Sequence, residues 1–211
     1  MLPAELMGLN EKKFKKYNYL IKNKKFINQL VLNVSSIIRL IKEKKLNSII
    51  LNYDERSNNF FQWYQQLVAE SLGKKSKGIL PIISTMPKDN HSLMQLYLDG
   101  PKNNFYTFFN VKEKRSEKIN NHSLLKPYQF LKNKSLYKLI NAQMEATRIV
   151  FEKKKLPFRS FEILNRSEDS MGELFCFFIL ETILLGRALN INPFDQPSVE
   201  LIKTETKRIL F

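Results

Sequence analysis

The feature that most constrains the fold is a regular alternation of short apolar runs with longer segments of helical periodicity. Between residues 26 and 45, apolar side chains recur every three to four positions, which is the spacing of an amphipathic helix. Residues 47–53 follow at once as a short β-branched run, which is typical of a buried parallel strand. This alternation predicts an α/β fold with a mainly parallel sheet, arranged as three α/β/α layers.

The same alternation continues to the end of the chain. Further helices are predicted at 59–72, 91–98, 135–155 and 170–189, with a last helix from Pro197 through Arg208, and further strands at 78–84, 104–111 and 159–164. Pro197 suits the first turn of a helix, where no backbone donor is needed. Ligands of parallel sheets collect at the carboxyl ends of the strands, so a site is expected in the segments after Tyr53 and Ser84.

Length and composition indicate a single domain and a protein of the reducing cytoplasm. With 211 residues, 43% of them hydrophobic and 16 of them Phe, the chain can bury a sizeable core. The single cysteine, Cys176, lies in an apolar run and is expected to be a small buried thiol. The first residues do not resemble a secretory signal, and the apolar segment 174–185 is too short to span a bilayer. A cytoplasmic protein without a membrane partner is expected.

A net charge of +15 raises the question of a nucleic-acid partner. The lysines are scattered along the whole chain, and the short Lys-rich pieces at 11–16 and 152–155 lie on segments of helical character. Charged runs of this kind are usually solvated helix faces. No nucleic-acid partner is therefore expected, although the positive charge can attract an anionic substrate.

Two polar residues on the predicted helix 59–72 are candidates for chemistry. Gln66 and Glu70 are four residues apart, so their side chains project from one helix face and can address one ligand together. A partly buried carboxylate can serve as a general base, which makes Glu70 the catalytic candidate. By themselves, however, a Gln and a Glu on a helix are usually surface residues.

The two histidines stand far apart in the sequence. His91, at the start of the predicted helix 91–98, is an exposed proton-transfer candidate, and the alternative is a solvated loop histidine. His122 has no comparable neighbouring residues and is interpreted as a structural or surface residue. Two separated histidines and one cysteine provide no spacing for a metal site, and no Gly-rich phosphate loop is present. Neither a metal nor a nucleotide cofactor is expected.

The segment 190–203 joins a turn rich in Asn, Pro and Asp to the start of the last predicted helix. Gln196 and Lys203 bracket the first two turns of this helix. Taken alone, Lys203 has the features of a surface lysine.

Four separated segments, in family order, resemble the signatures of the phosphoglucose isomerase family. They are Leu2-Pro-Ala-Glu-Leu-Met-Gly-Leu, Tyr64-Gln-Gln-Leu-Val-Ala-Glu-Ser-Leu-Gly-Lys, Asp89-Asn-His-Ser-Leu-Met-Gln-Leu-Tyr-Leu-Asp-Gly-Pro and Asn192-Pro-Phe-Asp-Gln-Pro-Ser-Val-Glu-Leu-Ile-Lys. The resemblance covers nearly the whole chain. It implies that residues 1–211 form the family's second sugar-isomerase domain with a helical carboxy-terminal arm, the first sugar-isomerase domain being absent.

By position, the resemblance implies an aldose-ketose isomerase that interconverts glucose 6-phosphate and fructose 6-phosphate in glycolysis and gluconeogenesis. Glu70 would be the base that moves a proton between sugar carbons 1 and 2 through a cis-enediol. His91 would assist ring opening and Lys203 would act at the ring oxygen. Gln66 and Gln196 would hold the phosphorylated hexose near its phosphate. In the family, the histidine serves the neighbouring subunit's site, so a homodimer is implied.

Part of the family's chemistry is missing from this sequence. No Gly-Gly dipeptide occurs, so the family's arginine that stabilises the enediolate is absent, and so is the Ser/Thr-rich phosphate loop. Ser198 and Ile202 replace glycines of the last signature, and Met86 replaces one in the loop before His91. The chain alone is expected to isomerise poorly unless an amino-terminal half associates with it. The alternative from another class is a non-catalytic phosphosugar-binding or interaction module.

Overall fold

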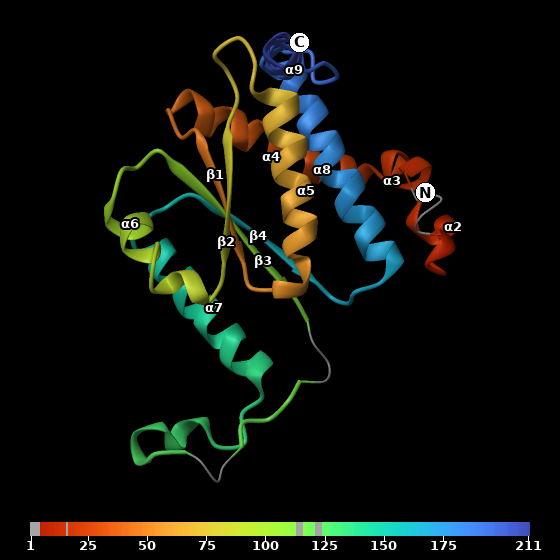
Figure 1. Cartoon of the computed structure of the whole chain (residues 1–211). Coiled ribbons are helices and arrows are strands. Elements are labelled where there is room, and N and C mark those ends of the chain that lie inside the picture. The colour runs from red at the N-terminus through yellow and green to blue at the C-terminus, as the bar shows by residue number, and fades with distance from the viewer. Residues whose placement is uncertain (1–4, 16, 113–115, 121–123) are drawn as a thin grey trace.

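Four parallel strands form the central sheet of the structure, a computed structural model that describes residues 5–15, 17–112, 116–120 and 124–211 (Figure 1). The strands are β1 (Asn47–Asn52), β2 (Leu80–Thr85), β3 (Asn104–Val111) and β4 (Phe158–Ile163). Their spatial order is β2-β1-β3-β4, and each neighbouring pair is parallel. Parallel strands need crossover connections, which the helices between them provide.

Helices cover both faces of the sheet (Figure 1). One layer consists of α4 (Lys24–Lys42), α5 (Asn58–Leu72) and α8 (Glu168–Ala188), and the other of α6 (Met94–Asp99) and α7 (Leu136–Lys153). Successive strand residues point to opposite faces and give each layer its own core. In β1, Ile50 packs in the first core, whereas Ile49 and Leu51 pack in the second. The predicted three-layer α/β/α fold is therefore confirmed.

The central strands are the most deeply buried. In β1, residues 48–52 are buried, and so is the whole of β3. Strands buried on both faces have near-continuous apolar sequences, which explains why these two segments are recognisable without an alternating pattern.

Further elements lie outside these two layers. They are α2 (Glu11–Phe14), α3 (Tyr17–Lys22), the 3-10 helices η1 (Glu55–Ser57), η2 (Lys88–Asn90) and η4 (Lys126–Leu131), and α9 (Pro197–Leu210). Helices α2 and α3 lie against α8. Between β3 and α7, residues 116–120 and 124–134 lie away from the sheet, and α9 lies at the opposite end of the molecule, beyond the end of α8 (Figure 1).

The predicted elements are confirmed, with shifts at their ends. α4 ends at Lys42 instead of residue 45, because Lys44 adopts a left-handed backbone with a φ of 63°. α6 begins at Met94, so the prediction that His91 opens this helix was wrong; His91 follows the preceding 3-10 turn, η2. Cys176 is buried, as expected. His122 lies outside the described residues.

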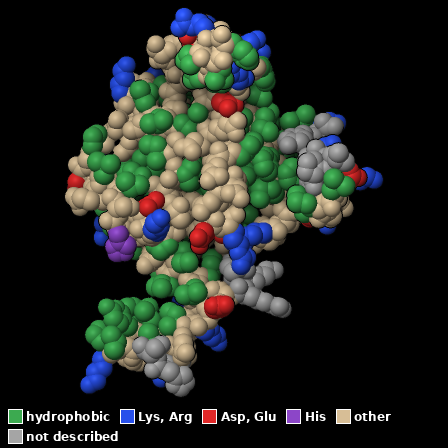
Figure 2. Space-filling model, viewed as in Figure 1, with side chains coloured by type: hydrophobic (Ala, Val, Ile, Leu, Met, Phe, Trp, Pro, Cys, Tyr) green, Lys and Arg blue, Asp and Glu red, His purple; other side chains and the backbone are tan. Residues whose placement is uncertain are grey.

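The face of the molecule in Figure 2 carries no single basic patch. Lys and Arg side chains lie in separate groups at several places, with Asp and Glu side chains among them. On this face, the positive charge of the chain is dispersed, as expected for lysines on solvated helices.

Candidate active site

The polar cluster around Glu70 lies in the last turn of α5. Glu70 Oε1 accepts a hydrogen bond of 2.9 Å from Gln66 Nε2, and its Oε2 accepts one of 2.6 Å from Gln196 Nε2. Two side-chain amides thus hold both oxygens of one partly exposed carboxylate. Because a carboxylate offers about four acceptor positions, Glu70 keeps lone pairs with which it can take a proton from a ligand.

The local structure of α5 explains how Glu70 is presented. The aromatic and aliphatic side chains of this helix are buried against the sheet and α8, which leaves Gln66 and Glu70 together on its polar side. The helix ends at Leu72, and a Cβ on the next residue, Gly73, would lie only 2.7 Å from the carbonyl oxygen of Ala69. A residue with a side chain would have to shift this turn. Gly73 therefore lets the chain leave α5 directly after the turn that carries Glu70.

Gln196 reaches Glu70 because the turn after α8 is tied to the turn after α5. Lys74 Nζ donates a hydrogen bond of 2.6 Å to the carbonyl oxygen of Asn192, and lies 2.9 Å from Asp195 Oδ1. The hydrogen bond from Lys74 lowers the pKa of Asp195 below its ordinary value of 3.8. These contacts bring a residue from the end of the chain beside the candidate base.

Lys74 and Asp195 are the residues that sequence reasoning did not single out. Each lies inside one of the segments that carry the family resemblance, at Tyr64 to Lys74 and at Asn192 to Lys203. No local pattern indicates that two residues so far apart in the chain form an ion pair. Their membership of two separate signatures is the signal that could have found them.

His91 lies at the other edge of the sheet from Glu70. Glu70 precedes β2 and His91 follows it, so the length of β2, roughly 17 Å at 3.3 Å per residue, separates the two regions. Asp89 fixes the turn that presents His91. Its Oδ2 accepts a hydrogen bond of 2.8 Å from the Thr85 backbone nitrogen, and its Oδ1 accepts one of 3.1 Å from the Ser92 hydroxyl. The exposed imidazole therefore does not reach Glu70 within one chain.

Lys203 also stands apart from the cluster. It is exposed, two turns into α9, and its Nζ lies 2.6 Å from Glu200 Oε1 on the same helix. The structure thus joins three of the five predicted site residues through hydrogen bonds, and it holds His91 and Lys203 elsewhere.

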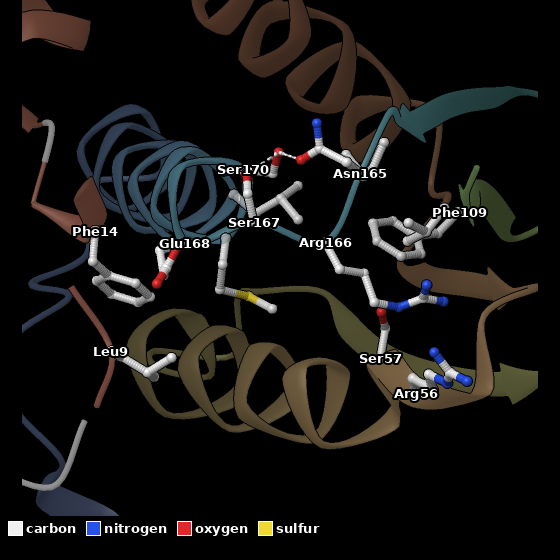
Figure 3. Close-up of a pocket in the computed structure, with 14 residues that line it drawn as sticks. Leu9, Phe14, Arg56, Ser57, Phe109, Asn165, Arg166, Ser167, Glu168 and Ser170 are labelled. Carbon is white, nitrogen blue, oxygen red and sulfur yellow. Dashed lines mark hydrogen bonds between the residues drawn. The ribbon is translucent and has the colours of Figure 1, made fainter. Parts of the chain in front are cut away.

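A cavity of about 400 Å³ lies at the carboxyl edge of the sheet (Figure 3). Figure 3 shows Arg56, Ser57 and Arg166 on one side of it, and Leu9, Phe14 and Glu168 on the other. Arg166 forms an ion pair with the buried carboxylate of Asp54. The segment after β1 therefore borders a cavity, at the carboxyl ends of the strands where ligands of parallel sheets collect. The Glu70 cluster instead lies near the amino edge, contrary to that expectation, because α5 runs back along the sheet before β2 begins.

Within the described residues, no helix is long and apolar enough to cross a membrane. Over the same part of the chain, no three side chains of His, Cys, Asp and Glu gather where they could hold a metal ion. Burial raises the pKa of the Cys176 thiol, which keeps it protonated inside α8.

No family model matches the chain, but curated proteins do. It is 35% identical to the glucose-6-phosphate isomerase of Methanocaldococcus jannaschii, over 72% of this chain and 38% of that protein. The glucose-6-phosphate isomerase of Campylobacter jejuni is 36% identical, over 77% of this chain and 41% of its own length. That of Mycoplasmopsis pulmonis is 32% identical, over 100% of this chain and 51% of its own length. The chain thus spans about half, or less, of the curated relatives that it matches.

Two solved structures share the fold. The crystal structure of a hypothetical protein from Thermus thermophilus aligns with a TM-score of 0.88 and 24% identity, over 99% of this chain and 52% of that one. A glucose-6-phosphate isomerase from Chlamydia trachomatis aligns with a TM-score of 0.61 and 19% identity, over 78% of this chain and 34% of that one. Identities this low support a common fold and nothing finer.

Proposed function

Since this chain belongs to the phosphoglucose isomerase family and spans about half the length of its curated relatives, we propose that it is the carboxy-terminal half of an aldose-ketose isomerase. The reaction is the interconversion of glucose 6-phosphate and fructose 6-phosphate, in glycolysis and gluconeogenesis in the cytoplasm. In this proposal, residues 1–211 are the second sugar-isomerase domain with its helical arm. The first sugar-isomerase domain belongs to the other half.

The observation that carries the proposal is the Glu70 carboxylate held by two amides. Isomerisation through a cis-enediol needs one base that takes a proton from one sugar carbon and returns it to the adjacent carbon. A carboxylate whose two oxygens are hydrogen-bonded at 2.9 and 2.6 Å keeps one position over both carbons. Gln66 and Gln196 each have a second amide hydrogen, which remains for the substrate near its phosphate.

The position of His91 supports a homodimer. In the proposed mechanism, His91 assists opening of the sugar ring, which requires it to reach the same substrate as Glu70. Because the two residues lie at opposite edges of the sheet, the histidine of one subunit must serve the site of its neighbour. The proposed enzyme is therefore a homodimer with shared sites.

Lys203 acts at the ring oxygen in this mechanism. Its present partner, Glu200, is exposed on the same helix. Exposed ion pairs contribute only about 0–1 kcal/mol. A substrate can therefore displace Glu200 from Lys203 at little cost in free energy.

The other half of the enzyme completes the site. This sequence contains neither a Gly-Gly dipeptide nor a Ser/Thr-rich phosphate loop, so the arginine for the enediolate charge and the phosphate clamp come from the amino-terminal half. Loss of such an electrostatic stabiliser costs on the order of a hundredfold or more in rate. The isolated chain is expected to fold but to isomerise poorly. Proton transfer between adjacent carbons requires no metal or redox cofactor, and none is proposed.

A complementation assay tests the proposal. The chain is combined with the amino-terminal half of the Mycoplasmopsis pulmonis enzyme, a relative that matches its whole length. Co-elution on size exclusion verifies the complex, and a coupled dehydrogenase measures glucose 6-phosphate formed from fructose 6-phosphate. We expect activity only with both halves, and a loss of roughly 10²–10⁴-fold for Glu70→Gln. Glu152→Gln, which alters an exposed glutamate on α7, is the matched control and should keep full activity.

Two outcomes contradict parts of this proposal. Equal rates for the complexes that carry Glu70→Gln and Glu152→Gln would show that Glu70 is not the base. Binding of fructose 6-phosphate without turnover by the complete wild-type complex would favour the non-catalytic phosphosugar-binding module.

A further inference from the structure

We propose that Lys74 is a positioning residue that fixes Gln196, and with it the start of α9, against the candidate base Glu70. The inference rests on the proposed function for the role of Glu70, but its geometry stands on contacts within this chain. Lys74 itself does not touch the substrate in this proposal. It acts through the turn that precedes α9.

The side chain of Lys74 is unusually enclosed for a lysine near the surface, with 9% of it exposed. Its Nζ lies 2.9 Å from Asp195 Oδ1 and donates a hydrogen bond of 2.6 Å to the carbonyl oxygen of Asn192. The turn is also braced internally, because Asn192 Oδ1 accepts a hydrogen bond of 3.2 Å from the Phe194 backbone nitrogen. One ammonium group therefore holds two points of a turn that is already compact.

Gln196 directly follows Asp195, and consecutive Cα atoms are about 3.8 Å apart. The contact that holds Asp195 therefore also restricts the position of Gln196. Gln196 is the last residue before α9 and has a non-helical backbone, with φ of −140° and ψ of 59°. Its side chain turns back to Glu70, while the helix that carries Lys203 begins at the next residue. The contact made by Lys74 thus sets the point from which both functional side chains of the arm depart.

Lys74 and Glu70 also lie close together in the sequence, at the end of α5. Lys74 is four positions after Glu70, and between them the chain makes a turn at Gly73 whose backbone contact with Ala69 leaves no room for a Cβ. The base and the residue that positions its amide partner are therefore attached to the same end of α5. Displacement of a catalytic group by about 1 Å can cost on the order of a hundredfold in rate, so this attachment matters for catalysis.

Lys77 offers a matched comparison. It extends from the same loop, and its Nζ donates a hydrogen bond of 2.8 Å to the carbonyl oxygen of Leu189. That contact anchors the beginning of the turn and does not involve Asp195. If general anchoring of the turn were sufficient, loss of Lys77 would have the same effect as loss of Lys74.

The first experiment observes the Gln196 side-chain amide by ¹H–¹⁵N NMR on the full chain. The signal is assigned by its disappearance in Gln196→Glu. A hydrogen bond to a carboxylate shifts an amide proton downfield and slows its exchange with water. We expect Lys74→Met to move this signal to the position of a free amide, Lys74→Arg to preserve most of the shift, and Lys77→Met to leave it unchanged. Equal unfolding midpoints for the three variants establish that the fold is intact.

The second experiment measures isomerisation by the complemented enzyme. Lys74→Met is expected to lower kcat and kcat/KM together by up to about a hundredfold, as for a misplaced catalytic group. Lys74→Arg should recover most of that loss, and Lys77→Met should stay close to the wild type. A Gln196 signal that is unchanged in Lys74→Met, or equal effects of Lys74→Met and Lys77→Met, would overturn the inference.

The two experiments also separate this inference from the proposed function. If the wild-type complex is inactive while Lys74→Met releases the Gln196 amide, the positioning contact stands and the isomerase proposal fails. If the wild-type complex is active and Lys74→Met changes neither the spectrum nor kcat, the isomerase proposal stands and Lys74 has no positioning role.

Discussion

Replacement of Arg159 by Met is expected to destabilise the whole domain. Arg159 projects from β4 towards α8 and forms an ion pair with Glu181, whose side chain is 1% exposed, against 17% for Arg159. The Arg159 guanidinium also donates hydrogen bonds of 2.8 Å to Asn33 Oδ1 and 2.9 Å to Thr107 Oγ1. It therefore connects β4 to α8, α4 and β3. Burial opposes its charge, but Glu181 keeps the pKa of Arg159 above its ordinary value.

The size of the effect follows from the charge that remains. Without Arg159, the Glu181 carboxylate is buried and uncompensated, which typically costs 3–5 kcal/mol, or roughly 6–20 °C in unfolding midpoint at about 2–4 °C per kcal/mol for a chain of this size. Removing both charges together avoids this cost. The double variant Arg159→Met/Glu181→Leu should therefore recover most of the lost free energy.

Urea unfolding measures these free energies, with the fluorescence of Trp63 as the signal. Trp63 is the single tryptophan of the chain and packs in the core beside Phe60 and Phe175. Arg39→Met is the matched control, because Arg39 is 76% exposed and its pair with Glu43 is 3.8 Å long; a change below about 1 kcal/mol is expected. The reasoning is refuted if Arg159→Met costs no more than Arg39→Met, or if the double variant is as unstable as the single one.

Two further predictions concern the core and the turn before α9. Phe178 is 0% exposed, and the centre of its ring lies 4.7 Å from that of Tyr64. Phe178→Ala should therefore lower the free energy of unfolding in urea by about 3–5 kcal/mol. Phe130, which is 70% exposed, is the control site, and a loss for Phe178→Ala as small as that for Phe130→Ala would contradict this prediction. The lowered pKa of Asp195 implies a contribution to stability that is present above its ordinary value of 3.8 and is lost as the pH falls below it. Hydrogen exchange should accordingly show better protection of α9 in the wild type than in Asp195→Asn above that pH, and a difference that persists in stronger acid would disprove the link.

Local spacing is sufficient to predict the secondary structure and part of the site. The helix from Lys24 and the strand from Asn47 are visible because periodicity of 3.6 residues, or a short β-branched run, depends only on near neighbours. The pairing of Gln66 with Glu70 is of the same kind, since residues four apart on a helix always share a face. The boundaries of α4 and α6 were less predictable, because backbone conformations at single residues decide where a helix ends.

By itself, the sequence determined the α/β class, the order of the elements, the resemblance to the phosphoglucose isomerase family and the candidate base Glu70. Only the tertiary structure decided that Gln196 completes the Glu70 cluster, that Lys74 holds Asp195, and that His91 lies at the far edge of the sheet. The physical reason is that contacts between distant segments depend on how helices pack and how turns are braced. No local pattern of residues determines the distances between segments that lie far apart in the chain.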